Sequence, residues 1–340
     1  MSRPIPLPAN PRILCIRLSA LGDTLLTLPA VRALHQTYPG ARIGYLTDPR
    51  HALILAGCPE VDEVLLLNRK QLQGLRPAAI AAFWHDVLSP IIFGKWDAVF
   101  DFQSFTETGL LAALSRAPVR VGRRYKTNAS WLYRPWVDAP HPETYMTEAH
   151  LDTLQVTGLA AATDDSAAYF DVPPEARTAW TVTRAGIDLS PAARTVGLFV
   201  GAARADRRWP PEKFAELASA LDQHSERPLQ YLVLAGPDES AEAEAVVREA
   251  RAAGCVIYRA STADLLELAA ALEFCDALVG NDTGPLHLSA AVGTPTCGIY
   301  RRALPHFLLP EPHRAVVAPD LDVSRVEVAD VATAAAELLR

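Results

Sequence analysis

The sequence predicts an α/β protein made of two Rossmann-like, doubly wound domains that face a cleft. Short apolar runs alternate with helix-length segments along almost all of the 340 residues. The runs are continuously apolar, which is typical of strands buried on both faces of a parallel sheet. The alternation is interrupted once, near residues 160–175, by a polar stretch that ends in two prolines. Such alternation favours parallel sheets joined by right-handed crossovers, and ligands usually bind between two halves of this kind.

Each half contains five runs with strand character. Those of the first half span 13–18, 42–47, 63–68, 98–103 and 119–122. Those of the second half span 195–201, 230–236, 255–259, 276–282 and 296–300. Helical segments lie between them, for example 211–224, 238–253 and 262–273. We therefore expect an N-terminal domain over 1–165, a C-terminal domain over 174–325 and a closing helix over 326–340.

The composition is that of a globular protein and argues against several other classes. Half of the residues are hydrophobic, 21% are charged and the formal net charge is −7, so nucleic-acid binding is not expected. No signal-peptide pattern or membrane-spanning apolar run occurs, and the five cysteines form no CxxC pair. We expect a cytoplasmic protein with buried free thiols. The absence of GxGxxG and GxxxxGKS/T motifs argues against NAD enzymes and P-loop ATPases.

The segment GNDTGPLHLSAAVGTPTCGIY (280–300) holds the strongest motif, a strand followed by a tight turn and a helix. Its candidate ligand-binding residues are Asp282, Thr283, Gly284, Pro285 and His287. Gly284 permits close approach of the backbone, and Pro285 suits the start of a helix. Free N–H groups at a helix start attract anions, so we predict a diphosphate site. The alternative is a purely structural helix start with Asp282 as its N-cap.

The segment IRLSALGDTLLTLPAVRAL (16–34) places one acid directly after the first strand. Asp23 is the only acidic residue between positions 1 and 47, and we interpret it as a candidate general base. The alternative is a helix N-cap, because the N-terminal end of a helix stabilises a carboxylate. Pro29 indicates that a helix kinks or begins near that residue.

Basic residues gather in two places. The loop after residue 201 carries Arg204, Arg207 and Arg208, which we expect to clamp the diphosphate and stabilise the charge of the leaving group. Residues 108–137 hold six basic residues and no acidic one, which predicts a site for carboxylate or phosphate groups. In both places the alternative is a solvated surface. The candidate contacts to an anionic substrate in the first half are Arg69, Lys70, Arg120, Arg123 and Arg124.

A metal site is not expected. Asp320 and Asp322 form the one DxD pattern of the chain, near its C-terminus, and we interpret it as a polar turn. No cluster of His, Cys and Asp has the spacing of metal ligands. Without a metal, helix N–H groups and arginines have to stabilise the charge of the leaving group.

Four segments, in this order, resemble glycosyltransferase family 9, the lipopolysaccharide heptosyltransferase family. They are RLSALGDTLLTLPAVRAL, RRWPPEKFAEL, LAGPDESAEAEAV and NDTGPLHLSAAVGTP, with lesser similarity at PEVDEVLLL and DFQSF. The resemblance implies the fold called GT-B, inverting transfer of a sugar, no metal and no cofactor beyond the nucleotide-sugar co-substrate. It implies ADP-heptose as the donor and an anionic lipopolysaccharide inner-core intermediate as the acceptor.

The resemblance also implies roles for single residues. The proposed catalytic base of the family falls on Asp23, and its contact to the donor ribose falls on Glu239. A basic residue that contacts phosphate, commonly Lys in the family, falls on Arg207. The donor-phosphate residues fall on Asp282, Thr283, Gly284 and His287. The chain departs from the family at residues 300–305, where YRRALP replaces the usual FGxTxP.

Two other functions stay open. A sugar-nucleotide epimerase shares the fold and the donor site, and a non-catalytic protein would bind the nucleotide sugar without turnover. The apolar segment 81–96 is compatible with peripheral contact with the inner membrane, although we predict a core helix there.

Overall fold

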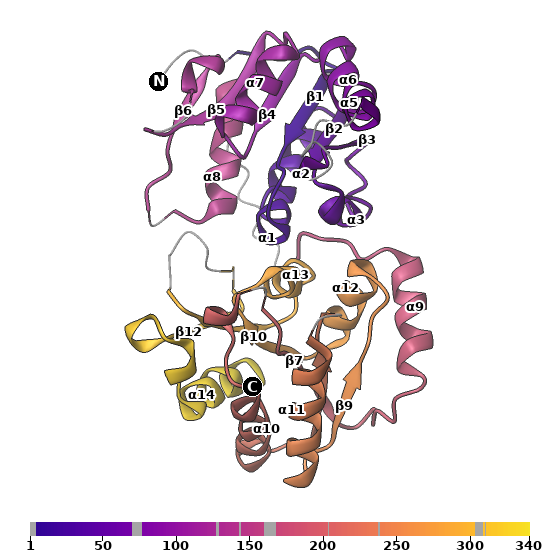
Figure 1. Ribbon diagram of the computed structural model, residues 1–340, viewed down its shortest axis with the longest axis vertical. Coiled ribbons are helices and arrows are strands. Elements are labelled where there is room, and N and C mark those ends of the chain that lie inside the picture. Colours follow the sequence, from indigo (N-terminus) through magenta and orange to yellow (C-terminus); the bar gives the residue numbers. More distant parts are fainter. Residues whose placement is uncertain are drawn as a thin grey trace. The chain divides into compact units, whose positions relative to one another are not determined.

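The computed structural model describes residues 5–69, 77–126, 129–142, 144–159, 168–202, 204–236, 239–302, 309 and 311–340. The chain divides into two compact units, Met1–Asp165 and Ser166–Arg340 (Figure 1). Each unit is built on a six-stranded sheet in which all the paired strands run parallel. The α/β fold class predicted from the sequence is thereby confirmed.

The sheet of the first unit has the strand order β3-β2-β1-β4-β5-β6. The strands are β1 (Arg12–Ile16), β2 (Arg42–Thr47), β3 (Glu63–Leu66), β4 (Ala98–Asp101), β5 (Val119–Arg124) and β6 (Trp136–Asp138). The order reverses between β1 and β4, so the carboxyl edge at these two strands is the topological switch point where such sheets bind ligands. The short, partly exposed strand β6 lacks an apolar run, and the sequence did not predict it.

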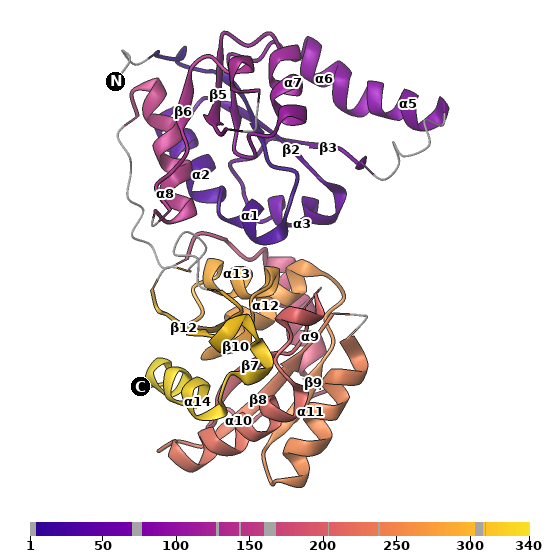
Figure 2. The ribbon, with the colours of Figure 1, turned by 60° about the vertical axis from the view of Figure 1, so that its left-hand side comes forward.

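Helices cover both faces of this sheet (Figure 2). They are α1 (Leu21–Leu25), α2 (Leu28–Thr37), α3 (Ala52–Leu55), α5 (Pro77–Phe83), α6 (Ser89–Phe93), α7 (Thr106–Leu114) and α8 (Met146–Asp152). The helical segment after β1 breaks behind Leu25, and α2 restarts at Leu28 with Pro29 as its second residue. At that position the missing N–H of proline costs no intrahelical hydrogen bond.

The sheet of the second unit has the order β12-β11-β10-β7-β8-β9, with its switch point between β7 and β10. The strands are β7 (Arg194–Phe199), β8 (Leu229–Leu234), β9 (Ile257–Ala260), β10 (Ala277–Asn281), β11 (Thr296–Tyr300) and β12 (His313–Val317). Strand β12 lies at the edge of the sheet and alternates between buried and exposed residues. It was not predicted, because it has no continuous apolar run.

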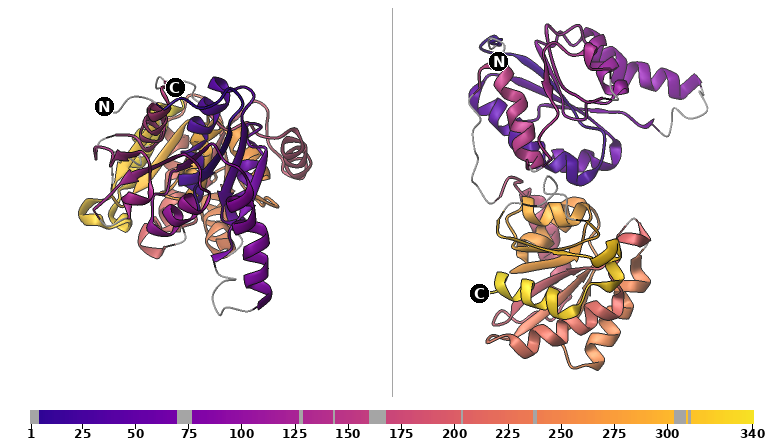
Figure 3. Two further views of the ribbon diagram at one scale, coloured as in Figure 1. Left: turned by 90° about the horizontal axis from the view of Figure 1, so that it is seen from above. Right: turned by 90° about the vertical axis from the view of Figure 1, so that its left-hand side faces the viewer.

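Two groups of helices enclose this second sheet (Figure 3). On one side lie α10 (Pro211–His224), α11 (Ser240–Ala252) and α14 (Val328–Leu338). On the other lie α9 (Pro174–Arg184), α12 (Leu265–Phe274) and α13 (Gly284–Ala291). The closing helix α14 packs against α10, β11 and β12, so it belongs to the second unit.

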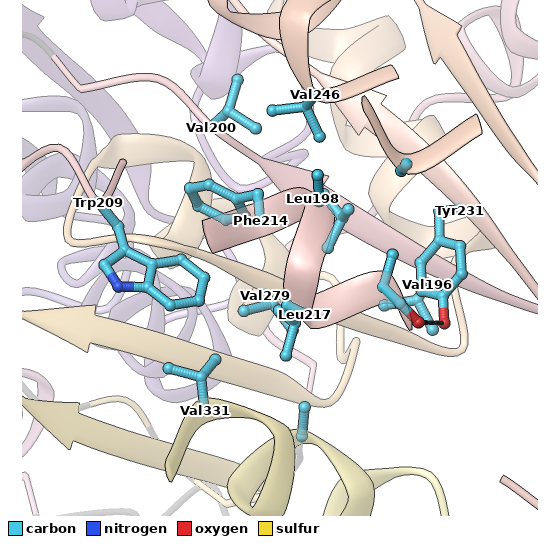
Figure 4. Packing of buried hydrophobic residues seen from close by; sticks show 14 of the residues in the cluster. Val196, Leu198, Val200, Trp209, Phe214, Leu217, Tyr231, Val246, Val279 and Val331 are labelled. Atoms are coloured by element: carbon cyan, nitrogen blue, oxygen red, sulfur yellow. Dashed lines mark hydrogen bonds between the residues drawn. The ribbon is translucent and has the colours of Figure 1, made fainter. Parts of the chain in front are cut away.

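The core beneath α10 and α14 is closely packed. Figure 4 shows Val196 and Leu198 of β7 beside Phe214 and Leu217 of α10, with Val331 of α14 below them. These five side chains are fully or almost fully buried. Burial of large aliphatic and aromatic side chains contributes about 1.5–3 kcal/mol each, so this face is a main source of stability.

The segment around residues 81–96 differs in part from the predicted core helix. A π-helical stretch (Trp84–Leu88) joins α5 to α6. Val87 and Ile91 are buried, whereas Trp84 is 51% and Phe93 65% exposed. Only one face of the segment therefore contributes to the core, because neither helix is covered on its outer side.

All five cysteines are buried and none forms a disulfide. In the part of the chain that the structure describes, no helix combines the length and the apolar character needed to cross a bilayer.

Candidate active site

The turn after β10 leaves two backbone donors open. Helix α13 begins at Gly284, directly before the Pro285 that suits a helix start, with Thr283 as its N-cap. The Thr283 hydroxyl donates to the Asn281 carbonyl (3.1 Å) and so does not cap the helix. Among the described residues no acceptor faces the N–H groups of Thr283 and Gly284. A turn with unpaired N–H groups at the positive end of a helix can bind an anion.

A guanidinium lies at the same turn. Arg207 Nη1 is 3.1 Å from Asp282 Oδ2 and 3.5 Å from the Asp282 carbonyl oxygen. Asp282 is therefore ion-paired. Thr283 is the N-cap of α13, so the alternative prediction of Asp282 as N-cap is wrong. The structure thus brings the predicted cation and the predicted phosphate-binding turn together at the switch point of the second sheet.

Arg208 has a different environment from Arg207. Its Nε donates to the Ala202 carbonyl (2.8 Å) and its Nη1 to Glu242 Oε1 (3.0 Å). These contacts tie the loop to α11. Arg204 forms a two-pronged, exposed ion pair with Asp206, at 3.0 and 2.8 Å. Of the three arginines of this loop, Arg207 is the one that reaches the turn after β10.

Asn281 links the loops of the site, a role that the sequence analysis missed. Its side chain is fully buried. Nδ2 donates to the carbonyls of Val200 (2.9 Å) and Gly201 (3.3 Å), and Oδ1 accepts from the N–H of Trp209 (3.0 Å). One amide thus fixes the loops after β7 and β10 to each other. The available indication was its place in the NDTGP motif, directly after a buried strand.

Glu239 lies against the backbone that follows β7. Its Oε2 accepts from the Gly236 N–H at 2.9 Å. A Cβ atom at Gly201 would overlap the Glu239 carboxylate in this position, so the glycine permits this close approach. The predicted ribose contact therefore lies at the carboxyl edge of the second sheet, as do Arg207 and Asp282.

A buried, neutral network lies behind the turn. The Tyr300 hydroxyl is 3.1 Å from His313 Nε2, and His313 Nδ1 is 2.8 Å from the Thr296 carbonyl oxygen. Burial lowers the pKa of His313 to about 4, and burial, with the nearby Asp282 charge second, raises the pKa of Tyr300 well above its usual value. The neutral imidazole thus donates a hydrogen bond from Nδ1 to the Thr296 carbonyl and accepts one at Nε2 from the Tyr300 hydroxyl. His287 is buried in the first turns of α13.

In the first unit Asp23 lies at the carboxyl edge, in the first turn of α1. Ala20 is the N-cap of this helix, so Asp23 is not the N-cap that the sequence left open. Asp23 Oδ2 accepts from the Ala20 N–H at 2.9 Å and forms an ion pair with Arg17 Nη2 at 2.5 Å. Arg17 Nη1 also donates to the Phe102 carbonyl at 2.9 Å. Arg17 was not singled out in the sequence.

The three arginines of β5 have different surroundings. Arg120 donates to the carbonyls of Ala117 (2.5 Å) and Leu132 (3.2 Å). Arg124 pairs with an exposed carboxylate, Asp138, at 2.6 Å. Successive side chains of a strand point to opposite faces, so neighbouring arginines meet different surroundings.

Arg123 points into the first unit. It is 2% exposed, and its Nη2 lies 3.2 Å from Nδ1 of the fully buried His150. Burial lowers the pKa of both groups, and for His150 the Arg123 charge is the second cause. The imidazole is therefore neutral and accepts from the guanidinium at Nδ1. The exposed Arg69 pairs with Glu107 at 3.3 Å, and Lys70 lies outside the described residues.

The DxD carboxylates serve a turn. Asp320 pairs with Arg325 at 2.5 Å, and Asp322 accepts from the Ser324 N–H at 3.0 Å. Within the described ranges, no three side chains of His, Cys, Asp or Glu gather into a group that could hold a metal ion.

Comparison with known proteins gives consistent matches. The family profile "Glycosyltransferase family 9 (heptosyltransferase)" matches residues 91–321. Lipopolysaccharide heptosyltransferase 3 of Escherichia coli is 25% identical over 286 residues, which cover 82% of this chain and 80% of the relative. The lipopolysaccharide core heptosyltransferase OpsX of Haemophilus influenzae is 22% identical over 305 residues, which cover 85% and 79%.

Solved structures show the same fold at lower identity. A family 9 glycosyltransferase of Veillonella parvula has a TM-score of 0.81 at 20% identity, covering 97% of both chains. E. coli heptosyltransferase WaaC, solved with ADP-2-deoxy-2-fluoro heptose, has a TM-score of 0.78 at 20% identity, covering 96% of this chain and 99% of that one. These similarities identify the GT-B type of fold.

The profile match covers more than half of the chain. It contains the turn at Asp282–Gly284 and the loop of Arg207, whereas Asp23 lies before it. The chain is therefore a glycosyltransferase and belongs to glycosyltransferase family 9, the heptosyltransferase family.

Proposed function

We propose that this enzyme transfers heptose from ADP-heptose to an anionic lipopolysaccharide inner-core acceptor, with inversion at the anomeric carbon and without a metal. The names of several relatives support the sugar and the acceptor class, since they are lipopolysaccharide heptosyltransferases. Related structures with ADP and with an ADP-heptose analogue support the nucleotide. In this proposal the first unit binds the acceptor and the second unit, with its closing helix, binds the donor.

The observation on which the donor site depends is the open turn after β10. The unpaired N–H groups of Thr283 and Gly284 and the guanidinium of Arg207 provide hydrogen-bond donors and positive charge at one place. We assign these groups to the diphosphate, with Pro285 and His287 completing the turn. The carboxylate of Glu239, at the same edge, is assigned to the ribose hydroxyls. Arg208 supports the loop through Glu242 and Ala202.

Bond formation in the proposed reaction joins an acceptor hydroxyl oxygen to the anomeric carbon of the donor. The bond from that carbon to the β-phosphate oxygen breaks, and ADP leaves with the electron pair. Asp23 accepts the proton of the attacking hydroxyl. Attack opposite the leaving group inverts the configuration. The charge that develops on ADP is stabilised by Arg207 and the helix N–H groups, which supply what a metal supplies in other transferases.

The acceptor is assigned to the first unit because Asp23 and its basic groups lie there. Arg120 and Arg124 use their guanidinium groups on carbonyls and on Asp138, and Arg123 is buried against His150. In this proposal Arg120, Arg123 and Arg124 exchange such partners for the anionic groups of the acceptor. Arg69 and Lys70 complete the proposed contacts to carboxylates or phosphates. A cytoplasmic location with peripheral contact with the inner membrane belongs to the same proposal. The exposed Trp84 and Phe93 support that contact.

The proposal is tested by incubating the enzyme with ADP-heptose, with and without a heptose-deficient inner-core acceptor, in the presence of EDTA. We expect ADP release only with the acceptor, and a product whose new linkage is inverted by NMR. A change of the donor without acceptor indicates an epimerase, and binding without turnover indicates a non-catalytic protein. Thermal-shift measurements with ADP, UDP and GDP identify the nucleobase of the donor. A ligand at about 100 times its Kd stabilises the folded protein by about 2.7 kcal/mol. Preference for UDP contradicts the donor assignment.

A further inference from the structure

We infer that Arg17 is the positioning residue of the catalytic base: it holds Asp23 Oδ2 and thereby leaves Oδ1 to accept the proton of the acceptor. The inference rests on the proposed role of Asp23 as the base. Arg17 Nη2 lies 2.5 Å from Asp23 Oδ2, and the Ala20 N–H binds the same oxygen at 2.9 Å. Among the described residues, no hydrogen bond is formed to Oδ1.

The guanidinium of Arg17 is anchored to the rigid part of the first unit. Its Nη1 donates to the carbonyl of Phe102, which directly follows β4. The Arg17 N–H continues the ladder with β2 by donating to Leu46 (3.0 Å), and the Phe102 N–H donates to Ile16 of β1 (3.0 Å). The side chain therefore spans the switch point between β1 and β4. Its position is fixed by the sheet.

Asp23 has no comparable anchor of its own. It lies in α1, a helix of five residues that breaks behind Leu25. The Arg17 and Asp23 side chains are 15% and 23% exposed, so their ion pair is only partly screened by water. A base must stand within hydrogen-bonding reach of the proton that it removes, and misplacement by about 1 Å can cost about 10²-fold in rate. Arg17 thus connects the position of the carboxylate to the sheet.

The planar guanidinium suits this task better than an ammonium. One terminal nitrogen binds the Phe102 carbonyl and the other binds Asp23, so a single group holds two acceptors in a fixed relation. A lysine ammonium is a point charge without this fork. Arg17→Lys should therefore keep a positive charge near Asp23, but the lysine should hold the Asp23 carboxylate less firmly.

The first test compares Arg17→Met with a matched control on the same strand. Arg12 lies at the opposite end of β1 and also forms an ion pair, with Glu63 at 3.0 Å. We expect Arg17→Met to lower kcat by about 10- to 100-fold and to change KM for ADP-heptose by less than about twofold. Arg12→Met should leave kcat within about twofold. Arg17→Lys should give an intermediate kcat, and an unchanged kcat in folded Arg17→Met overturns the inference.

The second test separates positioning from general support of the fold. In the Asp23→Asn background the carboxylate is already absent, so Arg17→Met should lower kcat by less than about twofold more. A further loss as large as that in the wild type shows that Arg17 acts through another group and overturns the inference, while the role of Asp23 stands. Near-full turnover of Asp23→Asn itself overturns the base assignment and this inference together. Circular dichroism and the thermal unfolding transition, compared with those of the wild type, verify that each variant is folded.

Discussion

The guanidinium of Arg207 lies 3.1 Å from the carboxylate of Asp282, which joins the loop after β7 to the turn after β10. The two strands are hydrogen-bonded neighbours, with Phe199 paired to Gly280, so their carboxyl ends deliver both residues to one edge. The Arg207 side chain is 42% exposed. The cation is therefore held at the anion-binding turn and still accessible to a phosphate.

Replacement of this cation should weaken nucleotide binding. We expect Arg207→Met to raise the Kd of ADP by about 10- to 100-fold, because a hydrogen bond to a charged group contributes about 1.5–3 kcal/mol. Arg207→Lys should raise the Kd of ADP by a smaller factor. Isothermal titration calorimetry measures the constants. Arg204→Met is the control, since Arg204 shares the loop but pairs with the exposed Asp206, and equal losses in both variants contradict the assignment.

The close approach of Glu239 to Gly201 makes a second prediction. A methyl group at position 201 would overlap the Glu239 carboxylate, so Gly201→Ala should displace it. We expect little loss of stability, because the overlapping atoms are the end of a flexible side chain that can move aside, but weaker binding of ADP. Gly186→Ala is the matched control, because a Cβ there meets nothing closer than the Thr183 carbonyl oxygen at 3.6 Å. Denaturant unfolding and ADP titration measure both effects. Unchanged ADP affinity in Gly201→Ala would argue against the ribose contact.

Loss of the proposed base should affect chemistry and spare donor binding. Asp23→Asn keeps the shape of the side chain, so we expect turnover to fall by at least about 10²-fold while the Kd of ADP stays within about twofold. Asp97→Asn serves as the control. Its carboxylate accepts from the Arg12 N–H at the other edge of the same sheet (2.8 Å). Acceptor-dependent ADP release measures turnover, and near-normal activity of Asp23→Asn disproves the assignment.

The buried His313 predicts a pH-dependent stability. Its pKa falls from 6.5 to about 4 on folding because burial disfavours the imidazolium. Between these values the unfolded chain binds one proton that the folded chain does not, so stability present above pH 6.5 is lost as the pH falls toward 4. The loss is about 1.4 kcal/mol per pH unit and about 3 kcal/mol in all. Urea unfolding from pH 4 to 7 should show this slope of the free energy of unfolding against pH. In His313→Gln the slope should fall by the contribution of one proton. An unaltered slope in the variant contradicts the prediction.

The fold class followed from local pattern. The predicted runs 42–47 and 230–236 are apolar without alternation, and β2 (42–47) and β8 (229–234) lie there. Such runs suit only strands covered on both faces, so the parallel sheets could be predicted. The edge strands β6 and β12 escaped prediction, because an exposed strand lacks that pattern and its pairing depends on residues far away in the chain.

The candidate site was predictable only where the motif and the edge of the sheet coincide. Asp282 and Gly284 follow a buried strand directly, so their position was evident from the sequence. The difference between Arg207 and Arg208 was not evident, because each guanidinium is directed by partners on other elements, Asp282 and Glu242. The β5 arginines differ for the same reason.

The sequence by itself determined the two parallel sheets, the turn at Gly284 and the presence of one acid after the first strand, since these depend on neighbouring residues. Only the tertiary structure decided that Arg17 holds Asp23, that Asn281 joins two loops and that Arg123 is buried. Each of these contacts brings together side chains from separate strands and loops. Periodicity along the chain fixes which face a residue occupies, but the partner that it meets there is set by how the strands are ordered in the sheet.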